Sequence, residues 1–294
     1  MTVAICCVCP EGVVFGADST ASMLVPGQGY HYLNHNQKIF EIGEDSTFGI
    51  ITWGLAGLPN VSYRTLVARL GDLLKISPPT KVLDVCKKWT DLFWAEYSAL
   101  DNYKLLQQLH LKTAHDPKST ASKKMRTAPE EQAYKQLQFG LVVGFCIGGS
   151  NVDDRQPCAF EILFDPLSPK PTPDPIPMND TRCWGVPKVF HRIVLGCDSD
   201  LMGSILQSSK WNGTQGELLA LIGKHRLGLP NLPIRDAIDF VFSSVLSTIK
   251  AIKFSRLSQT CGGPIEVGVI TSDRNFRWVC HKEWDTALKE GHSL

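Results

Sequence analysis

Threonine occupies position 2, directly after the initial methionine. A hydroxyl group is a poor nucleophile unless a base removes its proton during attack. An N-terminal threonine carries such a base in its own α-amino group, whose unperturbed pKa of about 7.7 to 8.0 leaves it partly neutral near neutral pH. The small side chain of Thr2 is compatible with removal of Met1 by methionine aminopeptidase. Met-Thr starts are common, so Thr2 gains meaning only together with other residues.

Two charged residues fall at the ends of predicted strands from which they could reach Thr2. Asp18 follows a predicted β-hairpin formed by Val3–Cys9 and Val13–Ala17, and the second strand of a hairpin returns to the edge where the first began. Lys38 opens the next predicted strand. A lysine at that corner would lower the pKa of a neighbouring amine by like-charge repulsion, with Asp18 as its counter-charge.

A glycine-containing run, Gly54-Leu55-Ala56-Gly57, follows another predicted strand. Glycine lets a substrate backbone approach closely, and the N–H of Gly57 would be exposed as a donor to an oxyanion. A simple turn before a helix would explain Gly57 equally well, and Gly54 is a competing candidate for the donor.

Composition limits the class of protein. The 294 residues carry a formal net charge of +1, with 43% hydrophobic and 20% charged, which gives no electrostatic reason to expect nucleic acid or a membrane as partner. No apolar run approaches the roughly 18 to 20 residues of a membrane-spanning helix and no secretory signal is recognised, so we expect a cytoplasmic protein. The ten cysteines lack the paired spacing of zinc ligands. We expect most of them to be reduced core residues, and we expect no metal site.

The elements that would hold these residues follow from hydrophobic periodicity. Continuous apolar runs predict strands covered on both faces, and spacings of three and four residues predict helices. Further strands are expected at Lys38–Ile42, Thr47–Trp53, Phe139–Ile147, Ala159–Phe164, Val189–Leu195, Ile265–Thr271 and Phe276–Cys280, and helices at Ser62–Leu74, Val82 to about Leu109, Asp200–Ser208, Gln215–Lys224 and Pro233 to about Arg256. Segregated strands and helices favour an α+β fold of antiparallel sheets covered by helices.

We expect one domain spanning 1–294 with two surface elaborations. A polar, basic stretch near 110–137 predicts an exposed insertion, and the prolines near 165–177 predict a stiff extended loop. The basic stretch lacks the interleaved aromatic residues of a nucleic-acid patch.

Further motifs occur in a fixed order along nearly the whole chain. They are Thr2-Val3-Ala4, the run from Pro10-Glu11-Gly12-Val13-Val14 to Gly16-Ala17-Asp18-Ser19-Thr20-Ala21, Lys38-Ile39-Phe40, Gly54-Leu55-Ala56-Gly57, Gly196-Cys197 and Cys261-Gly262-Gly263-Pro264-Ile265-Glu266-Val267. Together they resemble proteasome β subunits and their bacterial proteasome-like relatives, within the N-terminal-nucleophile (Ntn) hydrolases. The resemblance implies a four-layer αββα sandwich with Thr2 as nucleophile, its amine as base, Asp18 and Lys38 as supports and Gly57 as oxyanion donor.

The resemblance also implies hydrolysis of peptides or unfolded proteins within a homo-oligomer, without metal or organic cofactor, and makes an ATPase unfoldase a candidate partner. Several positions depart from the family pattern. Cys197 and Cys261 replace serines, Ser258 replaces an aspartate expected to orient the threonine, and Asp198 is a candidate to compensate. Two alternatives therefore stay open: an Ntn amidase or acylase acting on a small amide, and a catalytically silent proteasome-like structural subunit.

Overall fold

The computed structural model describes residues 2–25, 29–116, 124–227, 231–256, 258 and 260–282. Its strands are β1 (Val3–Cys9), β2 (Gly12–Ala17), β3 (Ala21–Val25), β4 (Gly29–Leu33), β5 (Ile39–Glu41), β6 (Phe48–Gly54), β7 (Val143–Ser150), β8 (Pro157–Phe164), β9 (Asp174–Ile176), β10 (Thr181–Gly185), β11 (Glu266–Thr271) and β12 (Arg274–Cys280). Its helices are α1 (Tyr63–Ile76), α2 (Val82–Ser98), α3 (Asp101–His110), α4 (Ala128–Gly140), α5 (Lys188–Leu195), α6 (Ser199–Gln207), α7 (Gln215–Gly223) and α8 (Ile234–Phe254). The pairings between these strands are antiparallel, in agreement with the predicted α+β fold.

The first sheet is built around the N-terminal hairpin, in the order β10-β1-β2-β11-β12. Ala4 pairs with Ala17, and the register continues to the turn, so the predicted hairpin is confirmed. Both strands are buried along their whole length, as their continuous apolar sequence predicts. Strand β11 pairs with β2, with Glu266 opposite Ala17, so the C-terminal part of the chain lies beside the first two strands.

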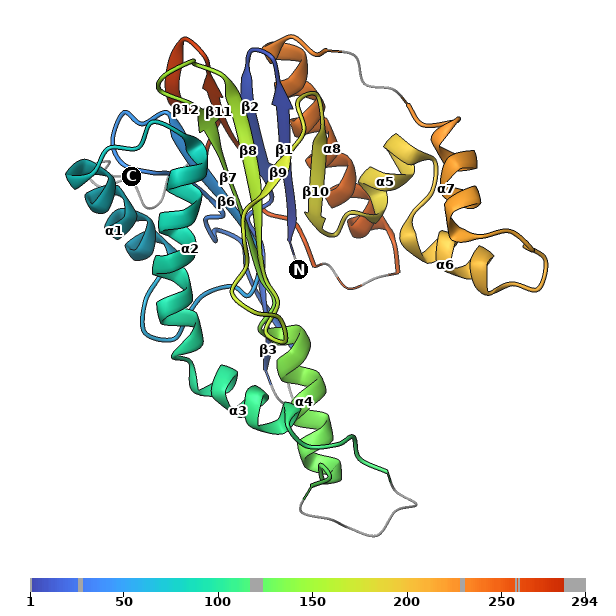
Figure 1. The fold of residues 1–294 in the computed structure, drawn as a ribbon. Helices are drawn as coiled ribbons and strands as arrows, with labels where there is room; N and C mark the ends of the chain where they lie inside the picture. Colours follow the sequence, from blue (N-terminus) through green and yellow to red (C-terminus); the bar gives the residue numbers. More distant parts are fainter. Residues whose placement is uncertain are drawn as a thin grey trace, which may run out of the picture.

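The second sheet, β5-β6-β7-β8-β9, lies against the first (Figure 1). Phe15 and Ile51 belong to the core between the two sheets. Helices α1 and α2 cover the other face of the second sheet with a core that includes Trp89 and Phe93, whereas α8 covers the first sheet through residues such as Val241. Each sheet therefore has apolar contacts on both faces. None of the helices in the described part of the chain is long and apolar enough to cross a membrane.

One predicted strand is a helix. Val189–Leu195 lies within α5, where Phe190 and Val194 share one face and join the core that α8 covers. Gly196 ends the helix at φ 78°, a left-handed conformation that glycine adopts without strain. The strand prediction was wrong because a short apolar run has the same composition in a strand and in a buried helix.

The basic stretch near 110–137 includes a helix. Residues 117–123 lie outside the described residues. After them α4 begins behind a capping box, in which the Thr127 hydroxyl accepts the Glu130 N–H and the Glu130 carboxylate accepts the Thr127 N–H. Helices α3 and α4 pack on each other and project beyond the lower end of the sheets in Figure 1.

Other boundaries also differ from the prediction. The helix expected from Val82 to about Leu109 ends at Ser98 and restarts at Asp101. The strand expected over Phe139–Ile147 starts only at Val143 because α4 occupies the preceding residues. The prediction did not include β3, β4 and β10, each of five residues, and β9 lies within the proline-rich loop and pairs with β8.

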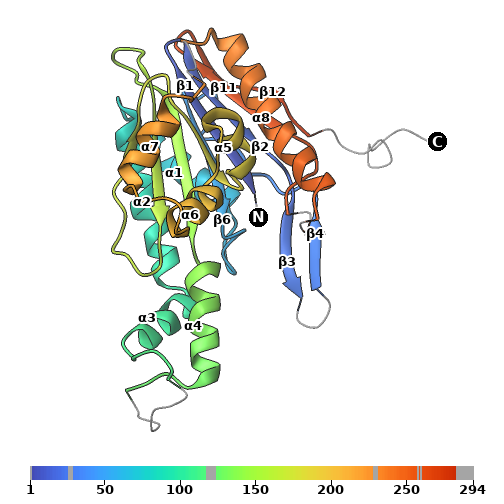
Figure 2. The same ribbon diagram turned by 90° about the vertical axis from the view of Figure 1, so that its right-hand side faces the viewer.

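The N-terminus lies at the end of the sheets from which two hairpins project. Figure 2 shows β3 and β4 extending from this end on one side, and α3 and α4 on the other. The β1–β2 register places the start of β1 and the end of β2 together at the same end. The residues at the start of β1 and the end of β2 therefore lie between the β3–β4 hairpin and the α3–α4 pair.

Candidate active site

The start of β1 and the end of β2 lie side by side. Thr2 directly precedes β1, and Asp18 directly follows β2. The Val3 N–H donates to Asp18 Oδ1 at 3.0 Å, and the Asp18 N–H donates to the Val3 carbonyl at 3.2 Å. Asp18 therefore contacts the residue next to Thr2, in the way that hairpin geometry predicts.

The Asp18 carboxylate is fully buried and accepts four hydrogen bonds. Its Oδ1 accepts from the Val3 N–H at 3.0 Å and from the Lys38 ammonium at 2.6 Å. Its Oδ2 accepts from the N–H groups of Thr20 and Gly262 at 3.1 and 2.9 Å. A buried carboxylate needs a paired charge and satisfied lone pairs, and Asp18 has both.

Lys38 is fixed at both its backbone and its ammonium. Its carbonyl accepts the N–H of Thr52 in β6 at 3.0 Å. Its ammonium donates to Asp18 and, at 2.7 Å, to the carbonyl of Thr20, and only 3% of the side chain is exposed. Burial lowers the pKa of Lys38 below its ordinary 10.5, although the negative charge of Asp18 acts in the opposite direction.

Thr2 and Lys38 line the same small cavity, of about 40 Å³. Thr52, Leu55 and Ala56 form further parts of its wall. Thr2 is 7% exposed, and a cavity of this size holds about one water molecule. The structure thus gathers Thr2, Asp18 and Lys38 at one end of the two sheets.

Gly57, the expected oxyanion donor, lies beside this cavity and not in its wall. Ala56 lines the Thr2 cavity, whereas Gly57 lines an adjoining cleft of about 1000 Å³. Neither of these two N–H groups donates a hydrogen bond to any residue in the described ranges. The competing Gly54 has a structural reason to be glycine, since it has φ 88° and a Cβ there would lie 2.4 Å from the Val142 carbonyl oxygen.

Of the possible supporting residues, Cys261 lies near the ion pair and Ser258 does not contact it. Cys261 is fully buried in the core beneath α8. Burial raises the pKa of its thiol to about 12, the Asp18 charge adds to this effect, and the Lys38 charge opposes it. Ser258 is exposed, and within the described residues no hydrogen bond joins it to Thr2 or Asp18.

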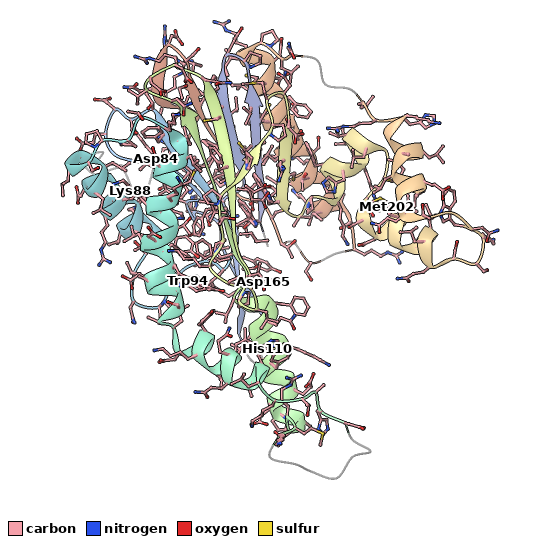
Figure 3. The ribbon with its side chains drawn as sticks, viewed as in Figure 1. Asp84, Lys88, Trp94, His110, Asp165 and Met202 are labelled. Carbon is pink, nitrogen blue, oxygen red and sulfur yellow. The ribbon has the colours of Figure 1, made fainter. Side chains whose placement is uncertain are left out.

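Cys197 and Asp198 lie elsewhere, at the start of α6. The Asp198 carboxylate caps this helix by accepting two backbone N–H groups of its first turn, both at 2.9 Å, and it pairs with Arg192. The hydrogen bond from the Leu201 N–H is the largest cause of the lowered pKa of Asp198, and the Arg192 charge lowers the pKa further. Figures 1 and 3 show α6, with Met202, set apart from the N-terminus. The structure therefore does not bring Asp198 to Thr2.

Three contributors to the site were missed by sequence reasoning. Thr20 supplies a carbonyl to Lys38, and Gly262 supplies an N–H to Asp18. The Tyr63 hydroxyl donates to the Leu55 carbonyl at 2.6 Å and so holds the loop that walls the Thr2 cavity. Thr20 and Gly262 both lay within recognised motifs, but their contributions come from the backbone, which every residue has.

The arrangement offers a hydroxyl group and a fixed positive charge in the wall of one small cavity, in a site that is mostly closed to water. A charge in such surroundings acts more strongly than at the surface, since less solvent screens it. Within the described part of the chain, no group of three or more His, Cys, Asp and Glu side chains is arranged to hold a metal ion.

Comparison with known proteins gives a loose structural likeness and no family assignment. No protein-family model matches the chain, and no curated protein matches its sequence. Among solved structures, the chain is similar to the "Gly-1" mutant of Anbu from Hyphomicrobium sp. strain MC1, with 10% sequence identity and a TM-score of 0.48. The alignment covers 96% of this chain and 90% of that chain. Similarity at this level says nothing about the chemistry of the site.

Proposed function

We propose that this chain is an N-terminal threonine hydrolase that cleaves peptide bonds, with Thr2 as nucleophile after removal of Met1. The observation that carries the proposal is the shared cavity of Thr2 and Lys38, whose ammonium Asp18 holds at 2.6 Å. A buried ion pair is weak evidence for stability, because apolar residues of similar size often stabilise a core as well. The buried Lys38 in the cavity of Thr2 is therefore better explained by a role in function than by a contribution to stability.

In the proposed reaction, removal of Met1 frees the α-amino group of Thr2. That amine accepts the hydroxyl proton as Thr2 Oγ attacks the carbonyl carbon of a substrate amide. The tetrahedral intermediate collapses as the protonated amine gives this proton to the leaving nitrogen, and an ester remains on Thr2. Water, deprotonated by the same amine, attacks the ester, releases the acid product and restores the hydroxyl.

Lys38 and the loop after β6 would stabilise the charges that develop in this reaction. The positive charge of Lys38 disfavours a protonated amine next to it, which lowers the pKa of that amine toward neutral pH. Ala56 lines the Thr2 cavity and Gly57 lines the adjoining cleft, and their N–H groups are the candidates for the oxyanion site.

The layered arrangement of helices and sheets supports the four-layer αββα sandwich of the Ntn hydrolases as the finer description of the fold. We extend the proposal to a homo-oligomer that acts on peptides or unfolded proteins in the cytoplasm, with an ATPase unfoldase as a candidate partner. Large apolar side chains exposed on α6 and α7, namely those of Leu201, Leu219 and Leu221, support self-association.

Two other functions give different experimental outcomes. An amidase or acylase would cleave small amides and leave peptides intact. A silent structural subunit would not react at Thr2. The exposed Ser258, where the related proteins are expected to have an orienting aspartate, favours the silent subunit. The four hydrogen bonds to Asp18 form without that residue and support an active centre.

Mass spectrometry and covalent labelling test the proposal together. The purified protein should lack Met1, and a peptidyl epoxyketone or a β-lactone should then add its mass to Thr2. The Thr2→Ala variant should take up no label and should not cleave fluorogenic peptides that the wild type cleaves. A retained Met1, or a processed chain that neither reacts with these probes nor cleaves peptides, would contradict the proposed function.

A further inference from the structure

A large cleft opens beside the Thr2 cavity. It has a volume of about 1000 Å³, and Asn36, Ala56 and Tyr63 line both spaces. Its remaining walls come from Phe40 of β5 and the residues before this strand, the loop after β6, the start of α1 and the residues that follow β12. A substrate bound at Thr2 would therefore extend into this cleft.

The side chains of this cleft that can carry charge near neutral pH are all basic. They belong to Arg64, Lys282, His35 and His281, and neither Asp nor Glu occurs among the lining residues. One fully buried carboxylate lies beneath them: Glu266 is 3.2 Å from the Lys282 ammonium and 3.0 Å from His281 Nδ1. These contacts are electrostatic and lack good hydrogen-bond alignment. Glu266 balances one positive charge, so the cleft keeps a positive excess through Arg64.

Arg64 forms no ion pair with any residue that the structure describes. Its guanidinium donates to the side-chain oxygen of Gln37 and lies 5.9 Å from the centre of the Phe40 ring. Acidic residues do line a neighbouring hollow that Arg64 also borders, but none pairs with it: Glu41, Glu44 and Asp72. Among the described residues, the Arg64 charge is therefore left without a carboxylate partner and can bind the anion of a ligand.

The N-terminus of α1 adds to the positive potential of the cleft. The Ser62 hydroxyl accepts the Thr65 N–H at 3.0 Å, whereas the N–H groups of Tyr63 and Arg64 have no acceptor in the described part of the chain. The first turn of this helix contains no acidic residue. The helix dipole and the free N–H groups both favour an anion here.

Lys282 lies near enough to Arg64 for their charges to repel. Burial is the largest cause of the lowered pKa of Lys282, Glu266 opposes it, and the positive charge of Arg64 lowers the pKa further. An anion bound in the cleft would relieve this repulsion.

We propose that this cleft selects substrates that carry a carboxylate close to the scissile bond, bound by Arg64 and the N-terminus of α1; the inference rests on the hydrolase function proposed above. Phe40, Leu58 and Val61 also line the cleft and would cover the aliphatic stem of an acidic residue. The carboxylate belongs either to an acidic side chain or to the free C-terminus of a peptide.

Binding of short peptides to the Thr2→Ala variant, which cannot turn them over, tests this selection. The probes are N-acetylated, C-amidated Ala-Ala-X-Ala peptides in which X is Glu, Gln or Lys, together with the Gln peptide that has a free C-terminal carboxylate. At low ionic strength a carboxylate-bearing peptide should bind at least about tenfold more tightly than the amidated Gln peptide, because its bonds to Arg64 are charge-assisted. The Lys peptide should bind most weakly.

Substitutions on α1 assign the effect to Arg64. Arg64→Gln should remove most of the preference, and Arg64→Lys, which keeps the charge, should retain part of it. Arg69→Gln is the matched control, since Arg69 lies on the same helix but pairs with Glu96 at 3.0 Å. It should leave the preference unchanged.

The outcomes separate the cleft from the hydrolase function. Equal binding of the charged and uncharged peptides, no measurable binding of any peptide, or a preference that survives Arg64→Gln would overturn the selection of a carboxylate. Cleavage by the wild type without such a preference would support the hydrolase and contradict the role of the cleft. Binding that depends on Arg64, with no cleavage and no label on Thr2, would support the role of the cleft and contradict the hydrolase. Tighter binding of the Glu peptide would identify an acidic side chain as the source of the carboxylate, and tighter binding of the free-acid Gln peptide would identify the C-terminus.

Discussion

Two aspartates of this chain, Asp18 and Asp198, are fully shielded from solvent and paired with a cation, yet they differ in what surrounds them. Asp198 accepts N–H groups from its own helix, and its partner Arg192 has a side chain that is 66% exposed. Asp18 accepts from three separate parts of the chain, and its partner Lys38 is 3% exposed. Local donors make a helix cap, whereas distant donors fix a charge inside the protein.

The difference also separates the energetics of the two pairs. An exposed cation is hydrated and screened, so its loss changes little. A buried cation and its carboxylate depend on each other, because removal of one partner leaves the other charged and without water. Asp18 and Lys38 should therefore behave as a unit, and Asp198 and Arg192 should not.

The largest expected effect is that of Asp18→Asn, compared with Asp198→Asn. The neutral amide that replaces the Asp18 carboxylate cannot balance the Lys38 charge, so the free energy of unfolding should fall by about 3 to 5 kcal/mol and peptide cleavage by about 10³-fold or more. Urea denaturation and steady-state kinetics measure the two effects. Asp198→Asn should shift the denaturation midpoint less and change cleavage by no more than a few-fold. Similar losses in both variants would remove the distinction between the two aspartates.

Lys38→Met should abolish labelling of Thr2 as well as cleavage, because it removes the positive charge next to the nucleophile. It also leaves the Asp18 carboxylate uncompensated and so should destabilise the fold. In the double variant Asp18→Asn/Lys38→Met, stability should partly return, since no buried charge remains, while activity should stay lost. If the double variant loses as much unfolding free energy as the two single variants together, the pair is not coupled.

Alkaline pH gives a smaller effect, and Cys261 is the residue near Asp18 that contributes to it. The Cys261 thiol has an ordinary pKa of 9.0 and a folded pKa raised to about 12 by burial. Between these values the unfolded chain has lost the proton and the folded protein keeps it, so stability should fall as pH rises, by about 1.4 kcal/mol per pH unit for one group. Cys261→Ala should reduce the slope of unfolding free energy between about pH 9 and 11 by roughly this amount. An unchanged slope would mean that Cys261 is accessible in solution.

The smallest effect is expected for Arg192→Gln. The substitution removes an exposed guanidinium, and the Asp198 carboxylate keeps its two backbone donors, so the helix cap survives. Thermal melting should shift slightly, and labelling of Thr2 should proceed at the wild-type rate. A fall in labelling comparable with that of Lys38→Met would place α6 in contact with the active centre.

The proximity of Thr2, Asp18 and Lys38 could be predicted because it depends on local structure. Residues 3–17 form a hairpin whose register follows from its own turn, and this register brings the residues at its two open ends together. Lys38 needed one further step, the placement of β5 in the second sheet, and here the expectation came from resemblance as well as from strand position.

The rest of the site depends on contacts that residue types do not encode. The carbonyl of Thr20 and the N–H of Gly262 bind charged groups through atoms present in every residue. Arg64 and Lys282 come from the start of α1 and from beyond β12, so only the folded chain reveals that they share a cleft. The same limit explains why Asp198 seemed a candidate for the centre: its neighbours in sequence resemble those of a site, while its position in space is that of a helix cap.

The hydrogen bond from the Gly262 N–H to Asp18 also sets an order of events during synthesis. The ribosome makes Thr2 and Asp18 well before Gly262, so this donor does not yet exist when the first two strands leave the ribosome. Until then the carboxylate that holds Lys38 lacks one of its four partners. The proposed centre would therefore be completed only after residue 262 has been made, and the hairpin that carries Thr2 and Asp18 would not by itself form the complete centre.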